Sequence, residues 1–143
     1  EIEKREIDIG KIQKDYASLK RKYDFILCEG AGGLHVPLIR NKYYIHDLIK
    51  DLNLDAILVT STYVGTLNHT LLTLNELKRL NINLKGIVIN KYSDSFFEKD
   101  NVDIIKKSSN VPVVLVKENK DIDKAFENTN FDKIFKGEID GFD

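Results

Sequence analysis

Residues 55–90 read DAILVTSTYVGTLNHTLLTLNELKRLNINLKGIVIN and contain a strand, a helix and a second strand in one stretch. Apolar residues occupy both faces of residues 55–60, as they do in a parallel sheet that helices cover on both sides. Residues 67–80 are predicted to form the helix, and 84–90 the second strand. A strand, a helix and a strand in this order indicate an α/β fold with a mostly parallel sheet.

The same alternation continues on both sides of this stretch. Further apolar runs predict strands at 24–28 and 111–116. Amphipathic spacing predicts helices at 9–22, 45–52, 97–108 and 121–128. Because no repeat, low-complexity tract or linker interrupts the pattern, we expect a single α/β domain over residues 1–143.

The composition is that of an ordinary soluble globular protein, with 42% hydrophobic and 31% charged residues and a net charge of -1. So small a charge gives no global field that would attract nucleic acid or an anionic membrane. No apolar run approaches the roughly 20 residues of a membrane span. Cys28 is the one cysteine, so no internal disulfide can form, which favours the reducing cytoplasm.

The sequence contains no methionine and opens with Glu1-Ile2-Glu3-Lys4. A translated chain ordinarily begins with methionine, and processing or a designed start could also remove it. We expect instead that an N-terminal segment is missing, because the motifs below include no loop that binds nucleotide phosphates.

Open parallel sheets bind ligands beyond the carboxyl ends of their strands. This rule selects three stretches, at 29–33, 61–68 and 90–93. Each carries the polar and glycine residues that a site would use, although loops between strands and helices are commonly polar and glycine-rich in any case.

Glu29 ends an apolar run and is followed directly by Gly30-Ala31-Gly32-Gly33. A carboxylate at a strand end can hold a divalent cation, since Mg²⁺ prefers oxygen ligands and bridges carboxylates to phosphate oxygens. The small residues beside it allow a substrate to approach the backbone closely. The alternative is an ordinary turn with an incidental glutamate.

Residues 65–73, GTLNHTLLT, begin a helix directly after a strand. The free N–H groups and positive dipole end of such a helix bind carboxylates or phosphates, and Asn68 could add a side-chain donor. Alternatively, Thr66 only caps the helix and His69 packs nearby. For His69 this second interpretation is favoured, because no second metal ligand lies at a suitable spacing.

Asn90 ends the strand at 84–90, where its amide could pair with the edge of a purine. Cys28 lies within a predicted strand and is interpreted as a small buried hydrophobic residue rather than a nucleophile. His35 and His46 are interpreted as structural or surface residues. No Ser-His-Asp, Cys-His or zinc-spaced cluster stands out in the sequence.

Over residues 24–116 these motifs resemble those of the dethiobiotin synthetases. The resemblance rests on Cys28-Glu29-Gly30-Ala31-Gly32-Gly33, followed by Val36-Pro37-Leu38, and on the stretch GTLNHTLLT one strand later. It implies a three-layer α/β fold with a mostly parallel sheet of the P-loop NTPase type, from which the N-terminal strand or strands are missing. Related P-loop families share the sheet but do not usually carry the second stretch.

The resemblance also implies a reaction, the ATP- and Mg²⁺-dependent conversion of 7,8-diaminopelargonic acid and CO₂ to dethiobiotin in biotin synthesis. Glu29 matches the catalytic, magnesium-ligating acid of that family. The implied substrate-binding residues are Gly30, Ala31, Gly32 and Gly33 along the diamine and carbamate, and Thr66, Leu67 and Asn68 at the tail carboxylate, across the interface of a homodimer. The implied nucleotide-binding residues are Asn90, which reads adenine, and the backbone of Pro112 and Val113 near the same base.

The sequence departs from the family in two places. It contains no Gly-x-x-x-x-Gly-Lys-Ser/Thr loop, and Lys117-Glu118-Asn119-Lys120 replaces the Gly-x-Ile-Pro-type segment expected after the last strand. We therefore expect an enzyme in the intact protein but little activity from this chain alone, because the phosphate loop is the main electrostatic stabiliser. Two alternatives are a non-catalytic or split α/β module that binds an anionic metabolite or a partner subunit, and another P-loop ATPase or amidotransferase relative, against which residues 68–69 argue.

Overall fold

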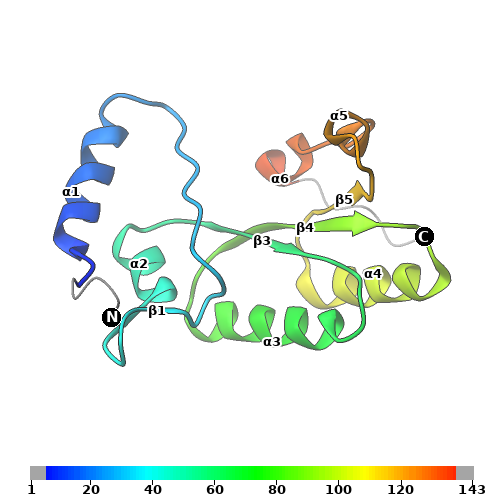
Figure 1. Ribbon diagram of the computed structural model, residues 1–143, viewed down its shortest axis with the longest axis horizontal. Helices are drawn as coiled ribbons and strands as arrows, with labels where there is room; N and C mark the ends of the chain where they lie inside the picture. The colour runs from blue at the N-terminus through cyan, green and yellow to red at the C-terminus, as the bar shows by residue number, and fades with distance from the viewer. Residues whose placement is uncertain (1–5, 138–143) are drawn as a thin grey trace. The chain divides into compact units, whose positions relative to one another are not determined.

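The computed structural model describes residues 6–137 of the chain (Figure 1). The chain divides into two compact units, with the boundary in the sequence between Leu54 and Asp55. Each unit has its own helices and its own small sheet, and each is described by itself. The single α/β domain over residues 1–143 stays a prediction.

The first unit consists of a helix, a short hairpin and a second helix: α1 (Ile9–Lys20), β1 (Pro37–Ile39), β2 (Tyr43–Tyr44) and α2 (Ile45–Asp51). The Asp51 carboxylate joins three of these elements. Its Oδ2 accepts hydrogen bonds from Gln13 Nε2 at 3.3 Å and from the Tyr43 hydroxyl at 2.6 Å. Both predicted helices of this unit are confirmed, whereas strands of three and two residues are too short to show a periodic pattern.

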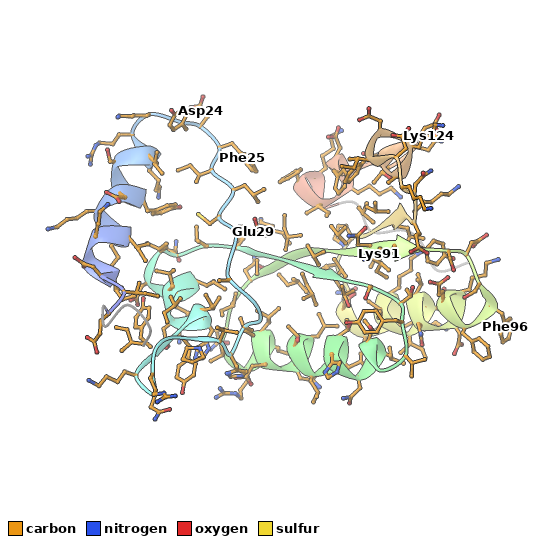
Figure 2. The ribbon with its side chains drawn as sticks, in the orientation of Figure 1. Asp24, Phe25, Glu29, Lys91, Phe96 and Lys124 are labelled. Atoms are coloured by element: carbon orange, nitrogen blue, oxygen red, sulfur yellow. The ribbon has the colours of Figure 1, made fainter. Side chains whose placement is uncertain are left out.

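The strand predicted at 24–28 is wrong. Residues 25–30 are neither helix nor strand, and neither sheet of the described residues includes them. Phe25 is 63% exposed and Leu27 73%, and Cys28 is exposed rather than buried as the sequence suggested. The reason is that an apolar run becomes a strand only where a neighbouring strand completes its hydrogen-bond ladder. Figure 2 shows Phe25 and Glu29 on this irregular connection between α1 and β1.

The second unit alternates strands and helices: β3 (Ala56–Thr60), α3 (Thr66–Arg79), β4 (Leu84–Tyr92), α4 (Phe96–Ser109), β5 (Val113–Lys117), α5 (Ile122–Phe126) and α6 (Asp132–Lys136). The strands lie in the order β3-β4-β5 and all pairs are parallel. The predicted strands and helices of this region are confirmed; only α6, which is five residues long, was not predicted. No helix within residues 6–137 is both long enough and apolar enough to cross a membrane.

Apolar side chains cover both faces of this sheet. On one face the fully buried Ile87 and Ile89 of β4 pack in a cluster with residues of α3 and α4, namely Leu74, Val102 and Ile105. On the other face Val88 of β4 packs with Val114, Val116, Ala125 and Ile134. Figure 1 shows α3 and α4 on one side of the sheet and α5 and α6 on the other. The three-layer α/β arrangement is therefore confirmed within this unit.

Helix α4 begins with a capping box. Ser95 is the N-cap and Glu98 the third helical residue, and each side chain bonds the backbone N–H of the other. Glu98 is buried, with 9% of the residue exposed. Hydrogen bonds from the side chains of Ser93 and Thr62, and from Ser95, lower the pKa of Glu98 to about 2, against the opposing effect of burial.

We predict that Gly86→Ala destabilises the second unit by about 1–3 kcal/mol, the usual cost of overpacking. A Cβ at Gly86 would lie 2.7 Å from Ile134 Cγ1 and 3.1 Å from the Pro112 carbonyl oxygen, so α6 would have to shift. Urea unfolding of the whole chain measures this cost. In an Ile134→Ala background the cost should fall, because the nearest obstacle is gone; an equal cost in both backgrounds would contradict the explanation.

We predict that Glu98 contributes to stability at neutral pH and that this contribution is lost in acid. The folded-state pKa is depressed, so the contribution is present above the ordinary value of 4.5 and disappears as the pH falls from 4.5 towards 2. The melting temperatures of the wild type and of Glu98→Gln should therefore differ at neutral pH and converge in that window. A difference that stays constant across the window would refute the assignment.

Candidate functional site

The three parallel strands of the second unit end at one edge of their sheet. The loops at 61–65 and 93–95 leave this edge from β3 and β4, and residues 118–121 follow β5. Ligands of parallel sheets bind at such an edge. The structure thus brings two of the predicted stretches, around Thr66 and Asn90, to the same edge of one sheet.

The N-terminus of α3 offers hydrogen-bond donors. Its N-cap is Gly65, in the left-handed region at φ 92°, so no side chain caps the helix, and the first turn carries no acidic residue. Thr66 is only 4% exposed, and its hydroxyl is buried with no hydrogen-bond partner among the described residues. A buried hydroxyl without a partner is costly, and a bound anion would satisfy it together with the free N–H groups of the first turn.

The start of α3 is held firmly against the sheet. The hydroxyls of Thr60 on β3 and Thr70 on α3 lie 2.7 Å apart, and Thr70 is fully buried. The backbone N–H of Thr66 donates to the Tyr63 carbonyl at 3.0 Å. Leu67 is half-buried, whereas Asn68 and His69 are exposed, so the Asn68 amide is accessible to a ligand.

Asn90 lies in a β-bulge near the end of β4. Ile89 pairs with Leu115 and Tyr92 with Lys117, so Asn90 and Lys91 together oppose Val116 alone. Lys91 takes φ 58°, and its N–H donates to Asn90 Oδ1 at 2.9 Å, which leaves the Asn90 amide nitrogen to donate elsewhere. Figure 2 marks Lys91 on β4. Bulges re-aim side chains and are frequent beside active sites.

The turn after the bulge is fixed by a tyrosine. Tyr92 is buried, and its hydroxyl donates to Asp94 Oδ1 at 2.9 Å, while Lys99 Nζ lies 3.4 Å from the same oxygen. These contacts lower the pKa of Asp94, with the Tyr92 hydrogen bond as the largest cause. Burial, and then the bond to Asp94, raise the pKa of Tyr92 to about 12.

Pro112 and Val113 are not brought to Asn90. They are buried at the amino end of the β5 region, where the Pro112 carbonyl accepts the N–H of Ile87 at 2.9 Å. The β5 residue opposite Asn90 is Val116, three positions further on, or about 10 Å along a strand. Because β4 and β5 are parallel, the amino end of β5 lies at the other edge of the sheet, away from Asn90.

Glu29 and the small residues after it belong to the first unit. The Glu29 side chain is exposed, so its carboxylate oxygens, which are ligands that Mg²⁺ prefers, are available. Gly32 has φ 80°, and a Cβ there would lie 2.9 Å from Val36 Cγ2, so the turn requires glycine. Gly30 contacts Ile45, Ala31 is exposed, and open space surrounds Gly33. The described residues include no group of three or more His, Cys, Asp and Glu suited to a metal ion.

Glu98 is the residue of this edge that the sequence analysis missed. Its carboxylate accepts hydrogen bonds from Thr62, on the β3–α3 loop, and from Ser93 and Ser95, on the β4–α4 loop. The pattern Ser95-x-x-Glu98 is the sequence signature of a capping box and could have located the carboxylate. Nothing in the sequence indicates its partner Thr62, which is 36 residues away.

The chain is similar to proteins of known family. The AAA domain family matches residues 1–124. Several similar proteins are named ATP-dependent dethiobiotin synthetase BioD. One, from Fusobacterium nucleatum, is 47% identical over 116 residues, which are 81% of this chain and 53% of the relative. One from Clostridium kluyveri is 44% identical over 116 residues (79% and 48%), and one from Thermodesulfovibrio yellowstonii is 43% identical over 120 residues (78% and 50%).

The chain spans about half the length of the curated relatives that it matches. The match to the family extends through both units, from the N-terminal residues to α5. The parallel sheet with helices on both faces agrees with the α/β fold of P-loop domains of the AAA type. By sequence and by fold, the chain belongs to the AAA domain family.

Proposed function

We propose that this chain forms part of an ATP- and Mg²⁺-dependent dethiobiotin synthetase. The observation that carries the proposal is the 47% identity, over 116 residues, with a relative that bears this name. In the whole protein we propose that the two units form one α/β domain, that the enzyme is a homodimer and that it works in the cytoplasm.

The proposed reaction closes a cyclic urea. One amine of 7,8-diaminopelargonic acid takes up CO₂ as a carbamate, ATP phosphorylates the carbamate oxygen, and the second amine attacks the carbonyl carbon and displaces phosphate. Chemistry of this kind depends on positioning and on neutralising charge more than on covalent help from the protein. The roles proposed for this chain are therefore to bind, orient and neutralise.

The N-terminus of α3 is the proposed site for the tail carboxylate of the substrate, through Thr66, Leu67 and Asn68. Two observations support it: the first turn has no capping side chain and no acidic residue, and the buried Thr66 hydroxyl has no partner among the described residues. An anion there would receive backbone N–H groups, the positive end of the helix dipole and a hydroxyl donor. In the proposed homodimer this helix binds the substrate of the partner subunit.

Glu29 is the proposed magnesium ligand, and Gly30, Ala31, Gly32 and Gly33 the proposed loop along the diamine and carbamate. The exposed carboxylate of Glu29 suits a hard cation, and the open space around Gly33 suits a close approach of substrate to backbone. When bound, Mg²⁺ would neutralise the phosphate charges of ATP. Glu29 would hold the cation, and the turn at Gly32 would keep the loop in shape.

Asn90 is the proposed residue for the adenine of ATP. Its side chain is exposed in the bulge and keeps an amide N–H₂ group free of the intramolecular bond to Lys91, so it can donate to a ring nitrogen of the base. We leave Pro112 and Val113 out of this proposed base site, because they are buried at the amino end of the β5 region.

A second candidate function is a non-catalytic or split module that binds an anionic metabolite or a partner subunit. The observation that favours it is the N-terminus of α3, which has no capping side chain and whose buried Thr66 hydroxyl has no partner among the described residues, so that it could bind an anion without ATP. Such a module would keep the anion site at α3 and bind diaminopelargonate, but it would not support ATP turnover even when it is joined to a chain that carries a phosphate loop.

A chimaera tests the proposed enzyme. We predict that the Fusobacterium nucleatum relative, with its matching half replaced by this chain, makes dethiobiotin from diaminopelargonate, bicarbonate and ATP. Glu29→Gln in the chimaera should lower the rate by about 100-fold or more, the order expected for a group that stabilises developing charge. Asp55→Asn, an exposed carboxylate at the amino end of β3 and away from the ligand edge, is the control and should leave the rate unchanged. A chimaera that unfolds cooperatively but forms no product would overturn the proposal.

Thr66→Val tests the carboxylate site in the chain itself. We predict that binding of diaminopelargonate, measured by calorimetry, weakens by about fivefold to tenfold, the loss of one hydrogen bond. The melting temperature should stay the same or rise, because valine removes a buried hydroxyl that has no partner. The matched control is Thr73→Val on the same helix, whose hydroxyl donates to the His69 carbonyl. A Thr66→Val protein that loses stability and binds normally would rule out the assignment.

A further inference from the structure

Two loops at the carboxyl edge of the second unit are joined through one carboxylate. The loop at 61–65 leads into α3 and the loop at 93–95 leads into α4. Glu98, at the third position of α4, receives hydrogen bonds from both. The first loop therefore leads to the proposed carboxylate site at α3, which serves the partner subunit's substrate, and the second loop follows Asn90, the proposed base site.

Each carboxylate oxygen of Glu98 accepts hydrogen bonds from a different loop. Oε1 accepts the hydroxyl of Thr62. Oε2 accepts the N–H and hydroxyl of Ser93, at 3.1 and 2.5 Å, and the N–H and hydroxyl of Ser95, both at 3.0 Å. All five donors come from the two loops, and all of them donate to the carboxylate of the buried residue Glu98. A buried charge satisfied so completely holds its donors in fixed places.

A helix cap alone does not account for this arrangement. The capping box needs only the reciprocal bonds between Ser95 and Glu98. Thr62 lies on a different loop, is itself 9% exposed, and adds nothing to the cap of α4. The hydrogen bond from Thr62 therefore connects the two loops and does not stabilise the start of α4.

On each loop, only a few ordered residues separate the Glu98 contact from a residue that is proposed to bind a ligand. On one side, Tyr63 follows Thr62 and its carbonyl accepts the N–H of Thr66, the first residue of α3. On the other side, Ser93 follows Tyr92, which is buried directly after the bulge at Asn90. A shift of either loop would consequently reach the other through Glu98.

We propose that Glu98 is a positioning residue that couples the proposed base site, at Asn90, to the proposed carboxylate site at the N-terminus of α3, which in the homodimer serves the partner subunit's substrate. This inference rests on the function proposed above. Glu98 does not itself bind either ligand, because a carboxylate would repel anionic groups and because its oxygens are already occupied by the two loops. Its effect on binding passes through Thr62 on one loop and through Ser93 on the other, whereas Ser95 serves the cap of α4.

The test uses the full 143-residue chain and three variants. Thr62→Val removes the bond between the loops and leaves the capping box in place. Thr62→Ser keeps a hydroxyl at the same position. Ser95→Ala weakens the cap of α4, typically by about 1 kcal/mol, but keeps the Thr62 bond, so it is the matched control for a merely structural effect.

Two readouts separate the coupling from the proposed function. The first is amide hydrogen exchange without ligand: Thr62→Val should speed exchange in both loops, by about fivefold, whereas Thr62→Ser should not. The second is calorimetric binding of diaminopelargonate with and without saturating adenosine, a probe that carries the base but no phosphate. In the wild type adenosine should change the affinity for diaminopelargonate by about fivefold or more, and in Thr62→Val this factor should fall to about one.

The outcomes are distinct. Loss of coupling in Thr62→Val, with coupling retained in Thr62→Ser and Ser95→Ala, supports the proposal. It is overturned if both probes bind the wild type independently, if Thr62→Val keeps the coupling, or if Ser95→Ala abolishes it equally. If neither probe binds the wild type, the proposed function fails, and hydrogen exchange still decides the link: faster exchange confined to 61–65 would show that Glu98 does not couple the loops.

Discussion

Strand β4 is bonded to a parallel neighbour on each edge and covered by apolar side chains on each face, and the second unit is organised around it. Ile87 and Ile89 face one helical layer while Val88 faces the other, so a one-residue slip in its register would exchange the two cores. Gly86 allows α6 to approach closely, because a side chain there would overlap Ile134. This single strand therefore determines which ends of its neighbours meet at the edge where the proposed ligands bind.

The same strand stops being regular directly after its buried residues 86–89, at the bulge formed by Asn90 and Lys91. The bulge frees the Asn90 side chain from the sheet, and the Glu98 network then holds the loop that follows. The regular part of β4, the bulge and the buried Glu98 carboxylate thus fix, one after another, the position of the loop at the edge of the sheet. Stability in the core is what allows an exposed edge to keep a defined shape.

Two apolar segments are less well covered than β4. Strand β3 pairs with β4 alone, and its Val59 is 63% exposed although the run 56–60 has the composition of a central strand. Phe25 and Leu27 are exposed as well, on a segment whose apolar run predicted a strand.

The sequence by itself determined the α/β class, the helices and strands of the second unit, and the small residues and helix start of the candidate site, because periodicity and glycine placement are local properties. The same local properties led to the wrong strand at 24–28, since pairing needs a neighbour that no local pattern supplies. Only the tertiary structure decided that Asn90 lies in a bulge opposite Val116, left the Thr66 hydroxyl buried without a partner among the described residues, and joined Thr62 to Glu98. These features depend on contacts between residues far apart in the chain, whose register is set by packing on both faces of the sheet.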